Sequence, residues 1–304
     1  MTESPLKSVN YVGLLFLAAI LWSTGGVIIK QLSASAPVIA CLRSTGAVVL
    51  ILIILRKPIK CPSLTVLAGA IFYAGTVILF VFSNKLTTAS NAIILQYTAP
   101  LYVLLLSRFW LKEKALISDW IFMLVLMGGI VLFFFDDLSG GRMLGNILAL
   151  ISGASFGSLT INLRMQKDQT PEDTILLGNI ICAVLTCPFL FMQTISAVDI
   201  TGSLFLGVFQ LGLPYLLFSI ALKKVRAIDG ILIPIIEPIL SPIWVFLFYG
   251  EIPGHWSIVG GTVVLASTVV RGMWMSRGFV INPPQAVCND IGGDGEEHPA
   301  RSNG

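Results

Sequence analysis

Long apolar stretches alternate with short polar connections along nearly the whole chain. A helix that crosses a bilayer needs roughly 20 mostly apolar residues, and ten stretches meet this requirement. They are 11–30, 36–55, 64–85, 89–111, 117–135, 144–164, 173–193, 203–222, 228–249 and 256–276. The pattern predicts an all-α integral membrane protein with ten transmembrane helices, between an N-terminal tail (1–10) and a polar, disordered tail (278–304).

The composition supports this class of protein. Of the 304 residues, 56% are hydrophobic and only 12% are charged, whereas a soluble domain carries about 25% charged residues. So few charges cannot cover a water-facing surface. The net charge of +3 gives no indication of nucleic-acid binding, and the five cysteines lack the paired spacing of a disulfide framework or a zinc site. We expect no metal and no cofactor.

The basic residues alternate between the two sides of the predicted membrane. The loops of one side carry only Lys30, Lys85 and Arg142. The loops of the other side carry fourteen: Lys7, Arg56, Lys57, Lys60, Arg108, Lys112, Lys114, Arg164, Lys167, Lys223, Lys224, Arg226, Arg271 and Arg277. Because loops rich in Lys and Arg stay in the cytoplasm, both termini are predicted to be cytoplasmic. We expect the plasma membrane, the inner membrane of a bacterium, as the location.

The two halves of the chain are similar to each other. Residues 79–113 align without a gap on residues 217–251 at a shift of 138, which pairs Pro100 with Pro238 (238 − 100 = 138). At a shift of 132, Gly13, Ser23 and Gly25 meet Gly145, Ser155 and Gly157. Each predicted unit (11–135 and 144–276) has five spans, an odd number, so the second would be inverted. Secondary transporters often have this inverted-repeat architecture, with sites near the midplane where helices are interrupted.

These motifs resemble the EamA-like branch of the drug/metabolite transporter superfamily. The resemblance is carried by ten spans, the WSTG motif at 22–25, the proline within the fourth span, the Glu-Pro pair at 237–238, and a glutamate closing each unit. It implies a transporter of small metabolites, amino acids among them, often in the outward direction. The resemblance names no substrate.

Glu237 is the main candidate for a functional residue. It lies near the predicted midplane of the ninth span, where an ionisable residue is costly and marks a functional site by default. Pro234 and Pro238 flank it, and such prolines leave backbone carbonyls that only protein, water or ligand can satisfy. Glu237 would bind a substrate amine or a proton; the alternative is a protonated side chain that ties two helices together. Pro234 and Pro238 are expected to form a helix break used in gating, with Pro100 as the counterpart in the fourth span.

Other polar and aromatic residues inside the spans could complete a binding site. Gln96 and Tyr97 precede Pro100, and we favour this side of the fourth span over the face with Asn91 and Thr98. The wider set of expected substrate-binding residues is Gln96, Tyr97, Ser241, Gln210, Trp22, Tyr73, Tyr215, Asn162 and Arg43. Each has a structural alternative: the small polar residues can pack helices together, and Arg43 can extend to the outer surface or hold a carboxylate. Glu113 and Glu251 are interpreted as helix caps.

Motifs for catalysis are weak or missing. GASFG (153–157) matches the G-x-S-x-G pattern of serine nucleophiles, but a serine needs a base, and the two histidines, His255 and His298, lie at a span end and in the tail. The sequence also lacks the phosphate-binding G-x-x-x-x-G-K-[ST] motif. We expect no enzyme activity, and transport driven by gradients rather than by ATP bound to this chain.

The sequence therefore predicts a secondary transporter that exports a small metabolite, an amino acid or a related compound, by alternating access, with proton coupling as an option. The alternative is a membrane interaction or sensor protein that uses the same scaffold without net flux. The expected partners are a small-molecule substrate and the lipid bilayer, with a homodimer as a further option and no nucleic acid.

Overall fold

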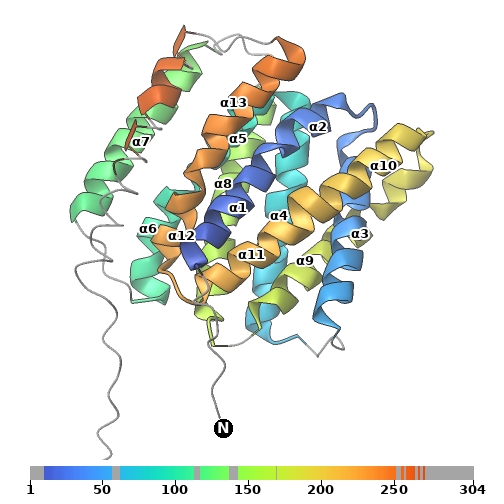
Figure 1. Ribbon diagram of the computed structural model, residues 1–304, viewed down its shortest axis with the longest axis horizontal. Coiled ribbons are helices and arrows are strands. Elements are labelled where there is room, and N and C mark those ends of the chain that lie inside the picture. The colour runs from blue at the N-terminus through green and yellow to red at the C-terminus, as the bar shows by residue number, and fades with distance from the viewer. Residues whose placement is uncertain are drawn as a thin grey trace, which may run out of the picture.

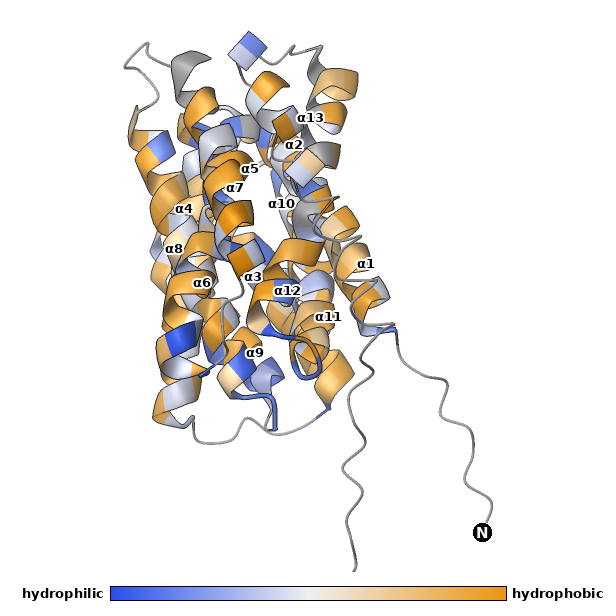
Figure 2. Ribbon diagram, turned by 90° about the vertical axis from the view of Figure 1, so that its left-hand side faces the viewer, coloured by the Kyte–Doolittle hydropathy of each residue, from blue (hydrophilic) through white to orange (hydrophobic). Residues whose placement is uncertain are grey.

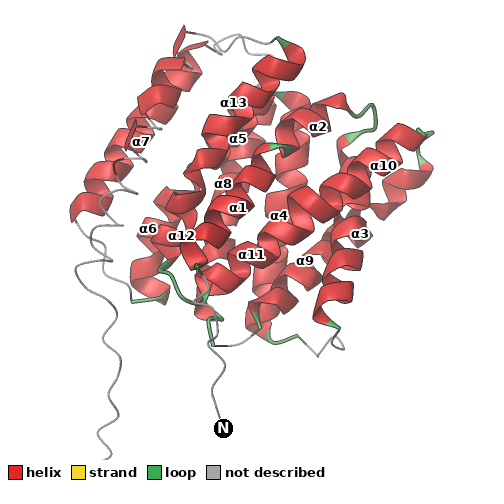
Figure 3. Cartoon of the chain, in the orientation of Figure 1, coloured by secondary structure: helices red, strands yellow, loops and turns green. Residues whose placement is uncertain are grey.

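The computed structural model describes residues 10–56, 62–112, 117–136, 143–168 and 170–250, together with 255–256, 258–263, 266–267 and 270. All regular structure in these ranges is helical (Figure 3). Seven helical segments are long and apolar enough to cross a membrane: Tyr11–Gln31, Ala36–Leu55, Leu64–Leu86, Asn91–Trp110, Met143–Met165, Pro171–Phe191 and Ala197–Leu222. They coincide with seven of the ten predicted spans. The tenth span, the two tails, Glu113 and Glu251 lie mostly or wholly outside the described residues.

Several of these segments consist of consecutive shorter helices. In chain order the elements are α1 (Tyr11–Ser23), α2 (Gly25–Gln31), α3 (Ala36–Leu55), α4 (Leu64–Leu86), α5 (Ala89–Gln96), α6 (Ala99–Trp110), α7 (Ile117–Asp136), α8 (Met143–Met165), α9 (Pro171–Thr186), η2 (Cys187–Phe191), α10 (Ala197–Phe205), η3 (Leu206–Gly212), α11 (Leu213–Leu222), α12 (Ala227–Leu232), η4 (Ile233–Ile235) and α13 (Ile236–Tyr249). α7 lies at the edge of the molecule in Figure 1, away from the central helices.

The surface and the interior have the polarity of a membrane protein. Hydrophobic residues make up most of each helix (Figure 2), and many large apolar side chains are exposed. Exposed examples are Phe191 at 85% and Leu124 at 72% of full exposure. By contrast, Arg43 and Asn179 are buried. Apolar groups that face outward suit the hydrocarbon core of a bilayer. Polar residues buried inside such a protein hold helices together or form functional sites.

Two interruptions of the helices are each followed by a proline, Pro100 or Pro238, in the first turn of the next helix. Pro100 is in the first turn of α6, directly after the break between α5 and α6 at Tyr97 and Thr98. Pro238 is in the first turn of α13, after the short 3₁₀ segment η4. A first-turn N–H has no partner within the helix, so a proline there loses no hydrogen bond. The expected helix breaks at Pro100, Pro234 and Pro238 are therefore present.

A third interruption was not predicted from the sequence. The helix from Ala197 to Leu222 contains a π-helical stretch, η3, between α10 and α11. It packs against α3, and the contact is close: a Cβ atom on Gly207 of η3 would lie 3.0 Å from the Cα atom of Gly46 in α3. π-Helical turns within α-helices are found frequently at functional sites, and this one carries Gln210.

Candidate functional site

A small cavity lies between the interrupted helices. Its volume is about 30 Å³, which is room for one or two water molecules. Within the described part of the chain, its lining holds one basic residue, Arg43, and one acidic residue, Glu237. The complete lining is Trp22, Arg43, Thr76, Val77, Phe80, Gln96, Phe156, Gln210, Leu211, Tyr215 and Glu237. Elements from both halves of the sequence therefore enclose one site.

Glu237 is buried, with 5% of its surface exposed, and its partner is Tyr97. The Tyr97 hydroxyl lies 2.9 Å from Oε2 of Glu237 and 2.8 Å from the carbonyl oxygen of Pro234. In an unbroken helix that carbonyl would accept from the N–H of residue 238, but Pro238 has no N–H. Tyr97 thus supplies the partner that Pro238 removes, and it connects the break before α6 to the break before α13.

Arg43 does not extend to the surface, which was one of its two predicted roles. Only 1% of the residue is exposed, and Nη2 donates to Oε1 of Gln210. Gln210 in turn donates from Nε2 to the carbonyl oxygen of Trp22, at 3.2 Å. Among the described residues, Nε and Nη1 of Arg43 have no hydrogen-bond partner. The guanidinium is therefore held on one side and left unpaired on the other.

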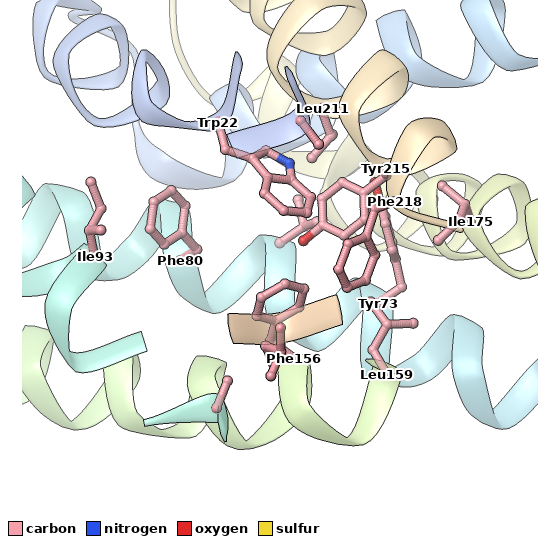
Figure 4. Close-up of a cluster of buried hydrophobic side chains, with 14 of the residues drawn as sticks. Trp22, Tyr73, Phe80, Ile93, Phe156, Leu159, Ile175, Leu211, Tyr215 and Phe218 are labelled. Atoms are coloured by element: carbon pink, nitrogen blue, oxygen red, sulfur yellow. The ribbon is translucent and has the colours of Figure 1, made fainter. Parts of the chain in front are cut away.

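Aromatic side chains form one wall of the cavity (Figure 4). The Trp22 ring makes edge-to-face contacts with Tyr215, at 4.9 Å between centroids, and with Phe156, at 5.8 Å. Tyr73 packs on Tyr215 at 4.7 Å but is not part of the lining, and its hydroxyl accepts a hydrogen bond from Nδ2 of Asn179. Trp22 and Tyr215 thus lie at the cavity, as expected of a pocket wall, with Tyr73 behind them.

Gln96 faces the cavity from α5 and belongs to a hydrogen-bond chain. Its Nε2 donates to Ser152 of α8 at 2.7 Å, and the Ser152 hydroxyl donates to the carbonyl oxygen of Thr76 in α4 at 2.9 Å. The favoured side of the fourth span is thus the one that reaches the cavity. Thr76, Phe80 and Phe156 also line it and were not among the predicted site residues; a polar residue within an apolar span, Thr76, was the one signal available.

Four predicted substrate-binding residues lie outside the lining: Tyr73 and Tyr97, described above, and Asn162 and Ser241. Asn162 donates from Nδ2 to the carbonyl oxygen of Thr65, at 3.0 Å, and accepts from Gln166 at 2.7 Å, so it links α8 to α4. Ser241 is fully buried one turn beyond Glu237, and its hydroxyl has no partner among the described residues. Farther along α13, the Trp244 indole donates to the hydroxyl of Ser23 at 3.1 Å.

The GASFG segment has a packing role in the structure. A Cβ atom on Gly153 would lie 2.7 Å from the carbonyl oxygen of Gln96, and one on Gly157 would lie 2.8 Å from that of Ala99. Real Cβ atoms do not approach so closely. The two glycines therefore let α8 lie directly against the break between α5 and α6, which accounts for the motif without a nucleophile.

Hydrogen bonds tie the helices together at both ends of the cavity. At one end, Asp199 of α10 accepts from the backbone and hydroxyl of Ser33, both at 2.7 Å, and from the backbone of Ala34 at 3.1 Å. At the other end, Lys223 pairs with Glu172 of α9 at 2.6 Å. The cavity between these ties is too small for a metabolite.

Comparison with known proteins identifies the family. Residues 10–135, and again residues 143–272, match the model of the EamA-like transporter family. The chain belongs to the EamA-like transporter family. The resemblance seen in the sequence is thereby confirmed, and a general role in transport as a multi-pass membrane protein follows from the family and from the apolar helices.

Two relatives with transporter names match this EamA-like chain over most of its length. An uncharacterized transporter of Archaeoglobus fulgidus is 24% identical over 260 residues, which cover 84% of this chain and 93% of the relative. The uncharacterized transporter YdfC of Bacillus subtilis is 25% identical over 232 residues, 72% of this chain and 76% of the relative. One solved crystal structure aligns with a TM-score of 0.69 at 17% identity, over 88% of this chain and 98% of the other. At this identity it shows the fold alone.

Proposed function

We propose that this protein is a secondary transporter that exports a small metabolite, an amino acid or related compound, across the plasma membrane by alternating access. Ten spans would form two inverted five-helix repeats, with both termini in the cytoplasm, and Glu237 would couple transport to a proton. The observation that carries the proposal is the cavity between the repeats, in which Glu237 and Arg43 are both buried within a transporter-family fold.

The positions of the helix breaks support the two-repeat arrangement. At the shift of 138, the break at Tyr97 and Thr98 corresponds to Ile235 and Ile236 (97 + 138 = 235; 98 + 138 = 236), where η4 ends and α13 begins. The family model also matches the two halves separately. In inverted-repeat transporters, interrupted helices of this kind form the site at the midplane.

The single hydrogen of the Tyr97 hydroxyl gives proton coupling a physical basis. A phenol can donate one hydrogen bond, yet Tyr97 lies within bonding distance of two oxygens, on Pro234 and Glu237. When Tyr97 donates to Pro234, only a protonated Glu237 can bond with the phenol oxygen, by donating to it. When Glu237 is ionised it accepts from Tyr97, and the carbonyl of Pro234 is left without that donor. Protonation would thus change the bonding at the break before α13.

The ties at both ends of the cavity support alternating access. Opening one end requires breaking contacts such as those of Asp199 with Ser33, and opening the other requires breaking the pair of Lys223 and Glu172. A partly exposed ion pair is worth about 1 kcal/mol or less, and a typical hydrogen bond about 0.5–1.5 kcal/mol net. Ties of this strength can be exchanged from one end to the other during a transport cycle.

Flux through purified protein in sealed vesicles tests the proposal. The probes are the twenty proteinogenic amino acids, labelled with ¹⁴C, with a pH gradient across proteoliposomes and an internal pH-sensitive dye. We expect flux of at least one probe, accompanied by proton movement that Glu237→Gln abolishes. Asp173→Asn is the matched control, because it removes a carboxyl group at the start of α9, away from the cavity.

Two results would contradict the proposal at different points. Unchanged flux and pH dependence in Glu237→Gln would remove the proton role from that residue. A thermal-shift screen that shows stabilisation by a probe, as mass action requires for a ligand, together with no flux in vesicles, would favour the interaction or sensor protein instead.

A further inference from the structure

The unpaired side of the Arg43 guanidinium is a feature that the folded chain does not explain by itself. An arginine carries five N–H donors and stays charged in proteins. Here Gln210 accepts from Nη2 of Arg43. The other two nitrogens, Nε and Nη1, carry three of the five donors and have no partner within the described residues. Only 1% of Arg43 is exposed. A buried charge without a counter-ion is costly in any apolar surrounding. Arg43 lines the cavity, so its missing partner can be supplied there.

The residues around Arg43 fix the position of its guanidinium group but do not neutralise its charge. Gln210 is neutral, and it is itself fixed by donating to the backbone of Trp22. Gly25 allows this arrangement, because a Cβ atom there would lie 2.7 Å from Cδ of Gln210. The π-helical turn η3 carries Gln210 into this position against α3. The protein therefore orients the cation and leaves its charge uncompensated, which is the arrangement expected of a site for an anionic group of a ligand.

We propose that Arg43 is the carboxylate-binding group of the transporter, with Gln210 as its positioning residue, and that the substrates are zwitterions held between Arg43 and Glu237. This inference rests on the proposed transport function and specifies its substrate class. Arginine binds carboxylates through pairs of N–H groups and so selects them by geometry as well as charge. Glu237 in the same cavity would accept from the ammonium group, and the wall of Trp22, Phe156 and Tyr215 would contact an apolar side chain.

The size of the cavity sets the condition under which this binding occurs. A volume of about 30 Å³ admits water but no amino acid. The lining helices must therefore move apart before a zwitterion can bind between Arg43 and Glu237, which both line the cavity. A substrate that reaches both groups gives each of them a partner, whereas a compound with one charge leaves the opposite group without a partner.

The test compares compounds on the wild-type protein, so it does not depend on a variant that folds. The probes are L-leucine and L-phenylalanine, their carboxamides, and the amines and acids that lack the carboxylate or the amino group: isopentylamine, phenethylamine, 4-methylpentanoate and 3-phenylpropanoate. Binding is measured by thermal shift, and transport by competition against whichever of the twenty labelled amino acids gives flux. We expect the carboxamides and amines to compete on the order of 100-fold more weakly than the parent amino acids, since a site built to bond a polar group rejects analogues without it.

Variants of Arg43 supply the second arm. Arg43→Gln should remove the preference for the amino acid over its carboxamide, while Arg108→Gln, at an exposed position of α6, should keep it. Gln210→Ala should weaken the preference without removing the charge. Amines or carboxamides that compete as well as the amino acids, with flux still present, would overturn the carboxylate site and leave transport standing. No flux with any of the twenty amino acids would overturn the proposed function instead.

Discussion

Replacing Tyr97 by phenylalanine tests the connection between the two helix breaks. The change deletes one hydroxyl and keeps the ring, which is 4% exposed. Two oxygens lose a neighbour: the carbonyl oxygen of Pro234, at 2.8 Å, and Oε2 of Glu237, at 2.9 Å. Pro238 offers no N–H to Pro234, so that carbonyl keeps only the contact with the backbone N–H of Ile236. Tyr97 is the hydrogen-bond partner that the described structure gives Glu237.

The expected loss of stability follows from the number of hydrogens involved. The hydroxyl donates one hydrogen bond at a time, so one buried acceptor is deprived of a donor in either protonation state of Glu237. A buried acceptor left unsatisfied costs about 1–3 kcal/mol. We therefore expect the free energy of unfolding to fall by about 2 kcal/mol, which corresponds to a decrease of about 3 °C in Tm for a chain of this size.

Thermal unfolding of the purified protein in detergent, followed by tryptophan fluorescence, measures the effect. Tyr102→Phe is the matched control, since Tyr102 lies half-buried one turn into α6 and its hydroxyl makes no hydrogen bond within the described residues. The control should unfold within about 1 °C of wild type. Equal Tm values for Tyr97→Phe, Tyr102→Phe and wild type would show that the hydroxyl does not hold the two breaks together, and the reasoning on proton coupling would lose its structural basis.

Three further changes test other parts of the structure. Gly153→Ala should lower Tm in thermal unfolding by several degrees and weaken transport, because its Cβ would lie 2.7 Å from the Gln96 carbonyl oxygen. The control Gly128→Ala, whose Cβ would have nothing within 4 Å, should leave Tm unchanged or raise it slightly. Asp199→Asn should cost about 2–3 kcal/mol, because an amide presents only one acceptor oxygen to the donors of Ser33, Ala34 and Ser196; urea unfolding against Asp173→Asn checks this. Lys223→Gln should change stability by less than about 1 kcal/mol, since its side chain is 27% exposed, and it should alter transport rates in vesicles more than Tm.

Local sequence patterns were enough to locate most of the helices. A bilayer-spanning helix needs a long apolar run, and such runs are visible without any tertiary information. Seven predicted spans therefore recur as long apolar helices, and the expected interruptions at Pro100, Pro234 and Pro238 are found at helix starts. Proline acts on the carbonyl four residues before it, which is also a local effect. The loss of the α-helical donor to the Pro234 carbonyl could thus be anticipated from the spacing alone.

The partners of these local features could not be predicted, because they depend on how distant segments meet. Tyr97 and Glu237 are 140 residues apart, and Arg43 and Gln210 are 167 apart. Gln96 lines the small cavity, whereas Asn162 of α8 lines a separate cavity of about 280 Å³ and bonds to the carbonyl oxygen of Thr65. Helical periodicity gives a direction around one helix axis and does not say which neighbour lies in that direction.

The π-helical turn η3 shows most clearly why the site needs the folded chain. An α-helical wheel assigns Gln210 to a face with Ser203 and Pro214, and one additional residue per turn at η3 changes that assignment for every residue after it. In the structure Gln210 accepts from Arg43 and donates to Trp22, while Gly25 leaves space for its side chain. Four segments must be in place before the cation is oriented toward the cavity. A polar residue within an apolar run therefore marks either a functional site or a bond between helices, and its partners, which decide between the two, come from packing.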